Sequence, residues 1–498
     1  MIGRERTNAV AALMIGVTAG GLVGAHPRAG RPIGAAAVVV MALGAAAGRG
    51  AASALVAACV AKDPVTCGDE PCGGTRVSVL IPARNEAAVL PDLIRDLAGQ
   101  GHRGHDAHQG FEVLVIDDGS RDGTGEVATC TAAATGLGGR LRVERVAAGS
   151  KGSALATADV GDRCSTIVVL DADARVPRSF ICEVSRLAMG NPAAALRRRT
   201  LHANADLWGS IQDDEQTVDG ALQALRWRTG GAPEFRGNGM VIHQDVLEAA
   251  GGWPRRQLTE DLALSTRLLL QGQRISWHGR VSVWEEAVAG IASFANQRSR
   301  WAEGSLRRLL TVRPVDLVAA PLPAPVRIDL LASFIQVVGP PALVGLLAGA
   351  LATGRTGRAV GIVAALAATT ALVVHPVLGA SEVADSTAAG SLSAVGRVAA
   401  PRAHRTVRLT VYLSHWIAAL LAALVRIALC PTAGGYRPTP HVRRAPPPWE
   451  RWPAHDPAVA LPGSAGHPEY ASRSSRPDRP GRGVVMARGV IDTGGARR

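Results

Sequence analysis

The stretch VSVLIPARNEAAVLPDLIRDLAG (77–99) decides the fold class, because an apolar run of strand length passes directly into a segment with helical periodicity. The same alternation recurs further along. Strand-like runs follow at 112–117, 141–146 and 166–171, and helix-period segments lie at 86–99, 124–134 and 151–159. Strands that alternate with helices are typical of βαβ units on a mostly parallel sheet. We therefore expect one α/β domain over residues 76–317.

Long apolar runs flank this domain, and each can supply the roughly 20 residues that a membrane-spanning helix needs. They lie at 8–25 and 33–61 before the domain and at 327–351, 358–380 and 407–430 after it. Four regions follow from this pattern. We expect two transmembrane helices and a linker in 1–75, the α/β domain in 76–317, further transmembrane helices in 318–430, and a disordered basic tail in 431–498.

The topology of the apolar runs stays open at this point. Arg4 and Arg6 before the first run would also suit a signal peptide, although a second apolar run favours a membrane helix. Gly339-Pro340-Pro341 predicts a kink or break in the run at 327–351. Three crossings after the domain would put the Arg-rich tail outside, against the positive-inside rule. Either one run is not a true crossing, or the rule fails here.

The composition indicates which kinds of partner the protein can bind. The net charge of +13, from 54 Lys and Arg against 41 Asp and Glu, suits phosphate-bearing substrates, anionic lipids or nucleic acid. Aromatic residues make up only 3% and no nucleic-acid-binding motif is present, so we expect no nucleic-acid partner. The seven cysteines form no CxxC pair, which predicts reduced thiols in a cytoplasmic domain rather than a metal site.

Polar clusters follow the expected strands, at the edge of an α/β sheet where ligands bind. The first strand runs into PARNE, the second into DDGSRDGT, and GSKG opens the helix after the third. Such turns can also be simple helix caps or loops. A glycine-rich helix start with a lysine can hold phosphate, however. The candidate nucleotide-binding residues are Pro82, Arg84, Glu86, Asp117, Asp118 and Lys151.

Two carboxylates follow the fourth expected strand, in the sequence Asp171-Ala172-Asp173. Mg²⁺ or Mn²⁺ binds through one or two carboxylates together with substrate phosphates, so this pair is a candidate metal site. A DxD sequence is often only an exposed loop. Its position directly after a buried strand is what favours the metal site.

Two further motifs carry candidate catalytic groups. Thr259-Glu260-Asp261 precedes a helical segment, where Thr259 can cap the helix while one acid serves as a general base. In QRSRW, Gln297, Arg300 and Trp301 share one helix face. An arginine there can neutralise a diphosphate and a tryptophan can stack on a sugar, although a basic amphipathic helix would look alike.

The ordered set IPARNE, IDDGSRDGT, DAD, TED and QRSRW resembles the membrane-bound family-2 inverting glycosyltransferases. GNGM (237–240), TEDLALSTRLLLQG (259–272), WEEAV (284–288) and LTVYLSHW (409–416) are similar to bacterial β-monoglucosyldiacylglycerol synthases within that family. The resemblance implies a GT-A-type fold for the domain. It also implies a UDP-sugar donor, with UDP-glucose expected, Mg²⁺ or Mn²⁺ as cofactor, and inversion to a β-linkage.

The resemblance assigns roles to the motif residues. Asp118 near Glu86 would bind the nucleotide, Asp171 and Asp173 would hold the metal and the diphosphate, and Asp261 would be the base. Gln297, Arg300 and Trp301 would line the acceptor and diphosphate site. The implied acceptor is a lipid hydroxyl, with diacylglycerol expected. The implied location is the plasma membrane, with the catalytic domain on the cytoplasmic side. Nothing in the sequence indicates the oligomeric state.

Alternatives remain within and outside this family. Processive polysaccharide synthases share the DxD, TED and QxxRW set, and a polyprenyl-phosphate sugar transferase or an inactive scaffold is a further alternative. The apolar segments after Leu317 contain only Phe334, Tyr412 and Trp416 as aromatic residues, which favours a lipid acceptor over a polymer path. The segment 305–313 interleaves leucines with arginines and predicts an interfacial helix on the membrane surface.

Overall fold

The computed structural model describes residues 2–59, 76–100, 110–161, 165–201, 207–255, 257–288, 290–388 and 401–430. The expected linker at 62–75 and the expected disordered tail at 431–498 lie outside these residues.

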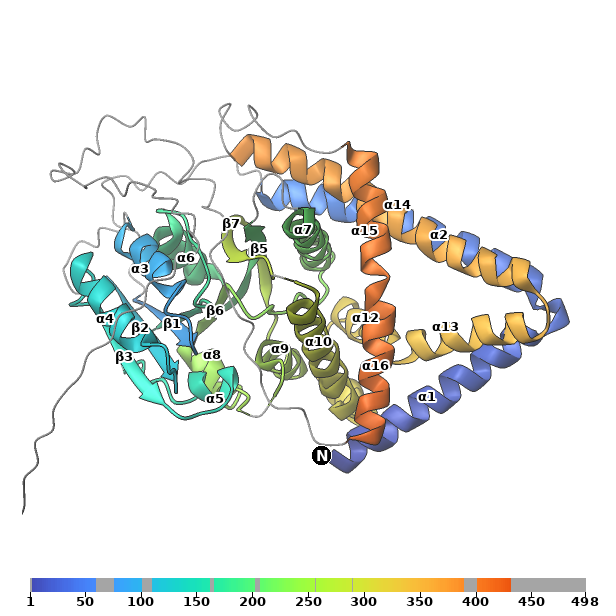
Figure 1. Ribbon diagram of the computed structural model, residues 1–498, viewed down its shortest axis with the longest axis horizontal. Helices are drawn as coiled ribbons and strands as arrows, with labels where there is room; N and C mark the ends of the chain where they lie inside the picture. The colour runs from blue at the N-terminus through green and yellow to red at the C-terminus, as the bar shows by residue number, and fades with distance from the viewer. Residues whose placement is uncertain are drawn as a thin grey trace, which may run out of the picture. The chain divides into compact units, whose positions relative to one another are not determined.

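A mixed seven-stranded sheet forms the centre of the domain, in the order β3-β2-β1-β4-β6-β5-β7 (Figure 1). β1 pairs in parallel with β2 and β4, whereas β6 runs antiparallel to β4 and β5. The strands are β1 (Val77–Ala83), β2 (Phe111–Asp118), β3 (Leu141–Val146), β4 (Thr166–Val169), β5 (Ala193–Leu201), β6 (Met240–His243) and β7 (Ser276–Glu286). The expected α/β class is confirmed, and the first four strands lie where the sequence predicts them.

Helices cover both faces of the sheet and bury two apolar cores. One core packs α3 and α6 on the sheet through Leu93, Leu97 and Phe180, and the other holds Phe235, Met240 and Leu264. The helices of the domain are α3 (Leu90–Ala98), α4 (Thr124–Ala134), α5 (Lys151–Leu155), α6 (Phe180–Gly190), α7 (Leu207–Arg228), α8 (Gln244–Ala249), α9 (Glu260–Leu270), α10 (Ile291–Thr311) and α11 (Pro314–Ala319).

Within the described residues, five helical segments are long and apolar enough to cross a membrane. They are Arg4–Ala25, Pro27–Cys59, Ile335–Ala352, Thr356–Asp385 and Arg402–Leu429. The helices that contribute to them are α1 (Ile2–Ala25), η1 (Pro27–Ala29), α2 (Gly30–Cys59), α13 (Ile335–Ala352), α14 (Thr356–Ala388), α15 (Arg402–Leu413) and α16 (His415–Leu429). The short α12 (Ala324–Ser333) precedes α13.

The helix has no break at Gly339-Pro340-Pro341, where the sequence predicts a kink or break. The helix is interrupted at Phe334, between α12 and α13, and both prolines lie inside α13. Gly16 of α1 makes room for the Pro341 ring, because a Cβ at Gly16 would lie 3.0 Å from Pro341 Cβ. The neighbouring helix thus accommodates the prolines without a break.

Glycines allow α1 and α13 to approach closely. An added Cβ at Gly20 would lie 2.3 Å from the carbonyl oxygen of Ala342, and one at Gly345 would lie 2.3 Å from that of Val17. Small residues spaced four apart are a usual interface between membrane helices, because the two backbones can then touch. α2 and α14 approach in the same way at Gly48, whose Cβ would lie 2.4 Å from Leu372 O. The four helices therefore form two pairs, α1 with α13 and α2 with α14 (Figure 1).

Two expectations about side chains are wrong. The segment 305–313 does not present an exposed apolar face. Leu306 and Leu309 are fully buried against α16, and Arg307 and Arg308 are also buried, in ion pairs. Pairing with buried acids lets these arginines face the protein interior. Cys182 is disulfide-bonded, so not all thiols are reduced.

The glycine packing predicts a sensitive position in α1. We expect Gly20→Ala to lower the free energy of unfolding by about 1–3 kcal/mol, because the new methyl group overlaps the α13 backbone. Gly34→Ala in α2 is the matched control, since nothing lies within 4 Å of its added Cβ. Thermal unfolding of the purified protein in detergent measures both. Equal midpoints for the two variants would contradict close packing at Gly20.

Candidate active site

A cavity of about 570 Å³ opens at the carboxyl ends of the central strands and continues between α7, α9 and α10. It brings together motif residues that lie more than two hundred positions apart in the sequence. All but one of the predicted site residues line it: Pro82, Arg84, Glu86, Asp118, Lys151, Asp171, Asp173, Glu260, Asp261, Gln297, Arg300 and Trp301.

Asp117, predicted as a nucleotide-binding residue, is the exception and does not line the cavity. Its side chain is completely buried, and Oδ1 accepts a hydrogen bond of 2.8 Å from the backbone N–H of Ser120. Arg145 Nε lies 3.4 Å from Oδ2. Since side chains alternate along a strand, the neighbour of a cavity-facing residue points to the other face. Asp117 therefore shapes the turn after β2.

The loops after β1 and β2 hold each other through side-chain hydrogen bonds. Asn85 has a φ of 59°, its backbone N–H donates to Ser120 Oγ, and its Oδ1 accepts from the N–H of Arg121. The N–H of Glu86 donates to Thr124 Oγ1. These bonds explain why α3 begins at Leu90 rather than at residue 86.

Asp118 is fixed in the cavity wall by the loop that follows β3. Its Oδ1 accepts hydrogen bonds from the backbone N–H groups of Ala148 (2.7 Å) and Gly149 (2.9 Å). Arg84 lies 3.8 Å from its other oxygen. A carboxylate held in this way is pre-oriented to accept hydrogen bonds from a ligand in the cavity.

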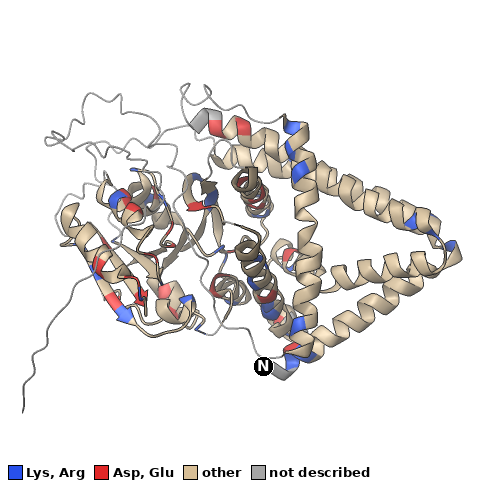
Figure 2. Ribbon diagram, in the orientation of Figure 1, with Lys and Arg blue, Asp and Glu red and all other residues tan. Residues whose placement is uncertain are grey.

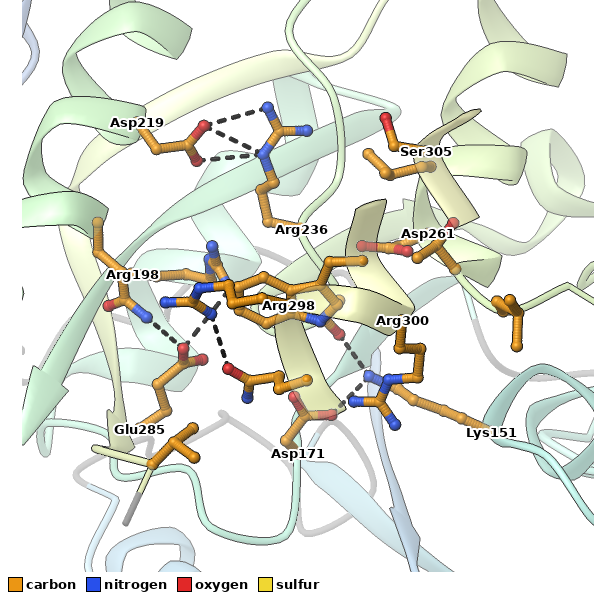
Figure 3. Close-up of a pocket in the computed structure, with 18 of the residues that line it drawn as sticks. Lys151, Asp171, Arg198, Asp219, Arg236, Asp261, Glu285, Arg298, Arg300 and Ser305 are labelled. Carbon is orange, nitrogen blue, oxygen red and sulfur yellow. Dashed lines mark hydrogen bonds and ion pairs between the residues drawn. The ribbon is translucent and has the colours of Figure 1, made fainter. Parts of the chain in front are cut away.

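Lys151 stands at the centre of the polar groups. Its Nζ lies 2.5 Å from Asp171 Oδ1, 2.8 Å from the carbonyl oxygen of Gly237 and 3.5 Å from Glu260 Oε1 (Figure 3). Burial alone would lower the pKa of Lys151, but the charges of Asp171 and Glu260 outweigh it and raise the pKa, so the ammonium group persists. The sequence predicts a phosphate-binding lysine here, and the structure adds that it joins the DxD and TED motifs.

Glu260 and Asp261 form a buried acid pair in the first turn of α9. Burial raises the pKa of Glu260 to about 7, although the charge of Lys151 opposes the shift. Burial also raises the pKa of Asp261 above its usual range, again against Lys151. Carboxyl groups with raised pKa values in a cavity are well suited to exchange protons near neutral pH.

Asp171 and Asp173 fit a divalent cation that takes its other ligands from a diphosphate and water. Both line the cavity directly after β4. Within the described residues no group of three or more His, Cys, Asp or Glu side chains could hold a metal ion alone. The donor set is thus two hard oxygen ligands, as expected for a metal that binds together with its nucleotide.

Glu285 is a cavity residue that sequence reasoning missed, although it belongs to the WEEAV pattern. Burial raises its pKa, and Asn238 Nδ2 donates to its Oε2 at 3.3 Å. Asn238 Oδ1 in turn accepts from the backbone N–H of Asp171 at 3.2 Å. Arg198 lies 3.5 Å from the other oxygen of Glu285. Asn238 therefore connects the end of β7 to the DxD motif.

The QRSRW motif lies on α10, and Gln297, Arg300 and Trp301 line the cavity as predicted. Arg300 points into the part of the cavity that contains Lys151 and Asp171 (Figure 3). Arg298 was missed by sequence reasoning. This residue is only 4% exposed, and the other four residues of the motif are half-buried. Its guanidinium lies 4.4 Å from the centre of the Trp301 ring.

The region around this site matches known proteins. Residues 75–304 match the family described as "Glycosyltransferase like family 2". We refer to residues 75–304, which match this family, as the family 2 domain. With the mixed sheet, this match confirms the expected GT-A-type α/β domain.

Relatives of the family 2 domain differ in their named products. The beta-monoglucosyldiacylglycerol synthase of Trichormus variabilis is 34% identical over 236 residues, which are 47% of this chain and 50% of that protein. The poly-beta-1,6-N-acetyl-D-glucosamine synthase of Staphylococcus aureus is 22% identical over 237 residues, 47% of this chain and 55% of that protein. A solved mannosyltransferase of Pyrobaculum calidifontis is 21% identical, with 80% of this chain and 98% of that chain covered and a TM-score of 0.49. The chain spans about half the length of the curated relatives it matches.

Four acids on α7 connect this helix to other parts of the family 2 domain and to α15, and sequence reasoning missed all of them. Each pairs with arginine from a different part of the chain. The pairs are Asp213 with Arg199 of β5, Asp214 with Arg405 and Arg408 of α15, Glu215 with Arg298 of α10, and Asp219 with Arg236. The only sequence signal was an unusual cluster of acids, 213–215 and 219, within a helical segment.

Glu215 holds three groups at once. It accepts hydrogen bonds from Arg298, from Tyr412 Oη at 2.8 Å and from Trp416 Nε1 at 2.8 Å. Tyr412 and Trp416 belong to the LTVYLSHW segment, so one carboxylate connects α7, α10, α15 and α16. Through Arg298 it also fixes the position of Trp301.

Removal of this carboxylate should destabilise the protein strongly. We expect Glu215→Leu to lower the free energy of unfolding by about 3 kcal/mol or more, because it leaves the buried Arg298 guanidinium without its carboxylate. Glu126→Leu is the control: its pair with Arg145 is exposed on both sides and contributes about 1 kcal/mol or less. Thermal unfolding of both variants is the measurement. An equally small shift in the unfolding midpoint of both variants would show that Glu215 does not stabilise the protein through Arg298.

Proposed function

We propose that the protein transfers a hexose, with glucose expected, from a UDP-sugar to a lipid hydroxyl, with diacylglycerol as the expected acceptor. The anomeric configuration inverts, and a β-glycosidic bond forms. The family 2 domain and the named product of the Trichormus variabilis relative support this proposal.

One observation carries the lipid acceptor. The same cavity is lined at one end by the strand-end residues Pro82 and Asp118, and at the other by Trp416 and Leu420 of α16. The α16 helix belongs to a candidate membrane span. A water-soluble donor and a membrane-bound acceptor can therefore approach one reaction centre from opposite ends.

Asp261 is the general base in this proposal. An alcohol is a weak nucleophile near neutral pH, so its proton must leave as the new bond to the anomeric carbon forms. The oxygen–carbon bond to the sugar forms while the bond to the diphosphate breaks on the opposite face, and the carboxylate of Asp261 takes the proton. Burial raises the pKa of Asp261, although the charge of Lys151 opposes the shift, and this makes it a stronger base than an exposed aspartate.

The leaving diphosphate needs positive charge around it. Arg300 and Lys151 line the cavity and can provide charge-assisted hydrogen bonds. Asp171 and Asp173 would hold Mg²⁺ or Mn²⁺, which supplies Lewis-acid stabilisation of the diphosphate when it is bound. Trp301 stands where it can stack on the acceptor, held in place by Arg298.

The proposed location is the plasma membrane, as a multi-pass protein with the family 2 domain on the cytoplasmic side. The candidate membrane spans support the proposal that the protein is a multi-pass membrane protein. The cytoplasmic side follows from the proposed donor, because nucleotide sugars are made in the cytoplasm.

A product assay tests the reaction. Membranes with the protein receive UDP-glucose, Mg²⁺ and diacylglycerol, and mass spectrometry identifies lipid products. We expect one monohexosyl-diacylglycerol from the wild type, and a rate lower by about 10²–10⁴-fold for Asp261→Asn. The control Asp245→Asn replaces an exposed acid of α8 and should keep the rate.

UDP binding separates the base from a binding role. We expect Asp261→Asn to retain most of its affinity for UDP, and loss of that affinity would contradict the assignment. A ladder of hexoses, or polymer without a lipid product, would instead support a polysaccharide synthase.

The buried acid pair predicts the pH dependence of transfer. Since burial raises the pKa of Asp261, the rate should fall on acidification at a pH clearly above the usual aspartate value of about 3.9. Lys151 lowers that pKa, so Lys151→Met should move the acid limb upward by about one pH unit or more, whereas Lys151→Arg keeps the charge and should move it less. The measurement is the rate of transfer as a function of pH from 4 to 9 for the wild type and both variants. An acid limb at the same pH in Lys151→Met as in the wild type would contradict the prediction.

A further inference from the structure

The last candidate span, Arg402–Leu429, differs from the other four in its contacts. It consists of α15 and α16, joined at Ser414, and we refer to residues 402–429 as the crossbar. Its first two turns contain Arg402, Arg405 and Arg408. Arginine inside the hydrocarbon core of a membrane is costly, which raises the question of whether this segment crosses at all.

Both ends of the crossbar contact the family 2 domain. Near its start, Arg405 and Arg408 lie 2.5 and 2.8 Å from the carboxylate of Asp214 on α7. Near its end, Arg426 lies 2.8 Å from Glu303 on α10. A helix that spans a membrane can present only one of its ends to a domain on one side.

The end of the crossbar also lies close to the start of α1. Arg307 of α10 forms an ion pair of 2.6 Å with Glu5, and its Nη2 lies 3.5 Å from the carbonyl oxygen of Cys430. Glu5 and Cys430 thus share one partner. Residues on opposite faces of a bilayer could not share a side chain of this length.

The four other spans have uncharged stretches of membrane length. At about 1.5 Å per residue, the distances from Arg6 to Arg28 in α1 and η1, and from Arg358 to Glu382 in α14, are about 33 and 36 Å. Hydrocarbon cores are about 30 Å thick. Figure 2 shows charged residues at both ends of these helices and almost none between. One membrane face therefore lies near the turns after α1 and α13, and the other lies at the domain.

The contacts of the crossbar with α14 and α1 lie in the halves of these helices that are nearer the domain. His375 Nδ1 of α14 lies 3.1 Å from Thr406 Oγ1, about 28 Å along the helix from the start of α14 at Thr356. At the other end, Ala423 and Ile427 pack against Ala9 of α1. Figure 1 shows α15 and α16 running across the two helix pairs rather than along them.

The remaining face of the crossbar is apolar and exposed. Val407 and Val411 are 64% and 68% exposed on α15, and Leu429 is 71% exposed on α16. A helix with one charged face and one apolar face is suited to lie in the membrane surface. The adjoining candidate spans also expose apolar side chains. The lipid that surrounds these spans would therefore also cover the apolar face of the crossbar.

We propose that the crossbar lies on the membrane surface at the domain side, with its apolar face in lipid, and that four helices cross the bilayer. This inference depends on insertion of the helices and not on the identity of donor or acceptor. It also resolves the positive-inside conflict. With four crossings, residue 430 leaves the membrane on the domain side, together with the arginines that follow in the sequence and with Arg4 and Arg6.

Two exposed native cysteines make the test direct. Cys130 marks the family 2 domain and Cys430 marks the end of the crossbar. Thr353→Cys places a third thiol in the exposed turn between α13 and α14. A membrane-impermeant maleimide is added to sealed vesicles of either orientation that contain the full-length protein, and mass spectrometry identifies the labelled peptides.

We expect Cys130 and Cys430 to be labelled in the same orientation and protected in the other, with Thr353→Cys labelled in the opposite one. Labelling of Cys430 together with Thr353→Cys would show a fifth crossing and overturn the proposal. Labelling of Thr353→Cys together with Cys130 would show that α13 and α14 do not cross, which would also overturn it.

A reporter fusion gives a readout that needs no thiol. Alkaline phosphatase, which is active only outside the cytoplasm, is fused after Arg498 or inserted after Gly354. We expect activity only at Gly354 if the domain is cytoplasmic, and activity only at Arg498 if it is not. Activity at both positions or at neither would contradict four crossings, whatever the outcome of the glycosyl-transfer assay.

Discussion

The ion pairs of α7 are the interaction on which the rest of the structure depends. Asp213, Asp214, Glu215 and Asp219 lie within two turns of one helix and bind arginines from the sheet, α10, α15 and the loop before β6. Charges in a poorly solvated place are stable only when they are paired. Each element must therefore take the position at which its arginine meets the helix, and this requirement fixes α10 and α15 relative to the reaction centre.

The same principle governs the cavity itself. Lys151 lies against Asp171 and Glu260, so a single cation offsets acids from two motifs that are far apart in the sequence. Burial raises the pKa values of Glu260 and Asp261 above those of surface carboxylates. The charge of Lys151 lowers the same pKa values and so limits the shift. A diphosphate that enters this place would compete with Asp171 for the lysine. Donor binding and the protonation of the acid pair are therefore coupled through Lys151.

Sequence reasoning found the parts of the fold and the site that depend on local pattern. The four strands with continuous apolar runs were found, because buried parallel strands have that signature. β5 was missed because Arg197 and Arg199 interrupt its apolar pattern. Both are buried in ion pairs with acids distant in the sequence: Asp385 pairs with both, and Asp213 also pairs with Arg199. Glu215 and Arg298 were missed for the same reason: their importance comes from each other, across more than eighty positions. Pairing at a distance leaves no periodic trace in a sequence.

The position of the crossbar has a consequence for the acceptor. Trp416 and Leu420 of α16 line the far end of the cavity, while the same helix contacts α1 only near its domain end. If α16 lies at the membrane surface, this end of the cavity is at the depth of lipid headgroups rather than in the hydrocarbon core. The free hydroxyl of a diacylglycerol also lies at that depth, because its polar end stays near water while its chains stay in the membrane. The lipid would then reach Asp261 without leaving the bilayer, and only the UDP-sugar would have to enter from solution.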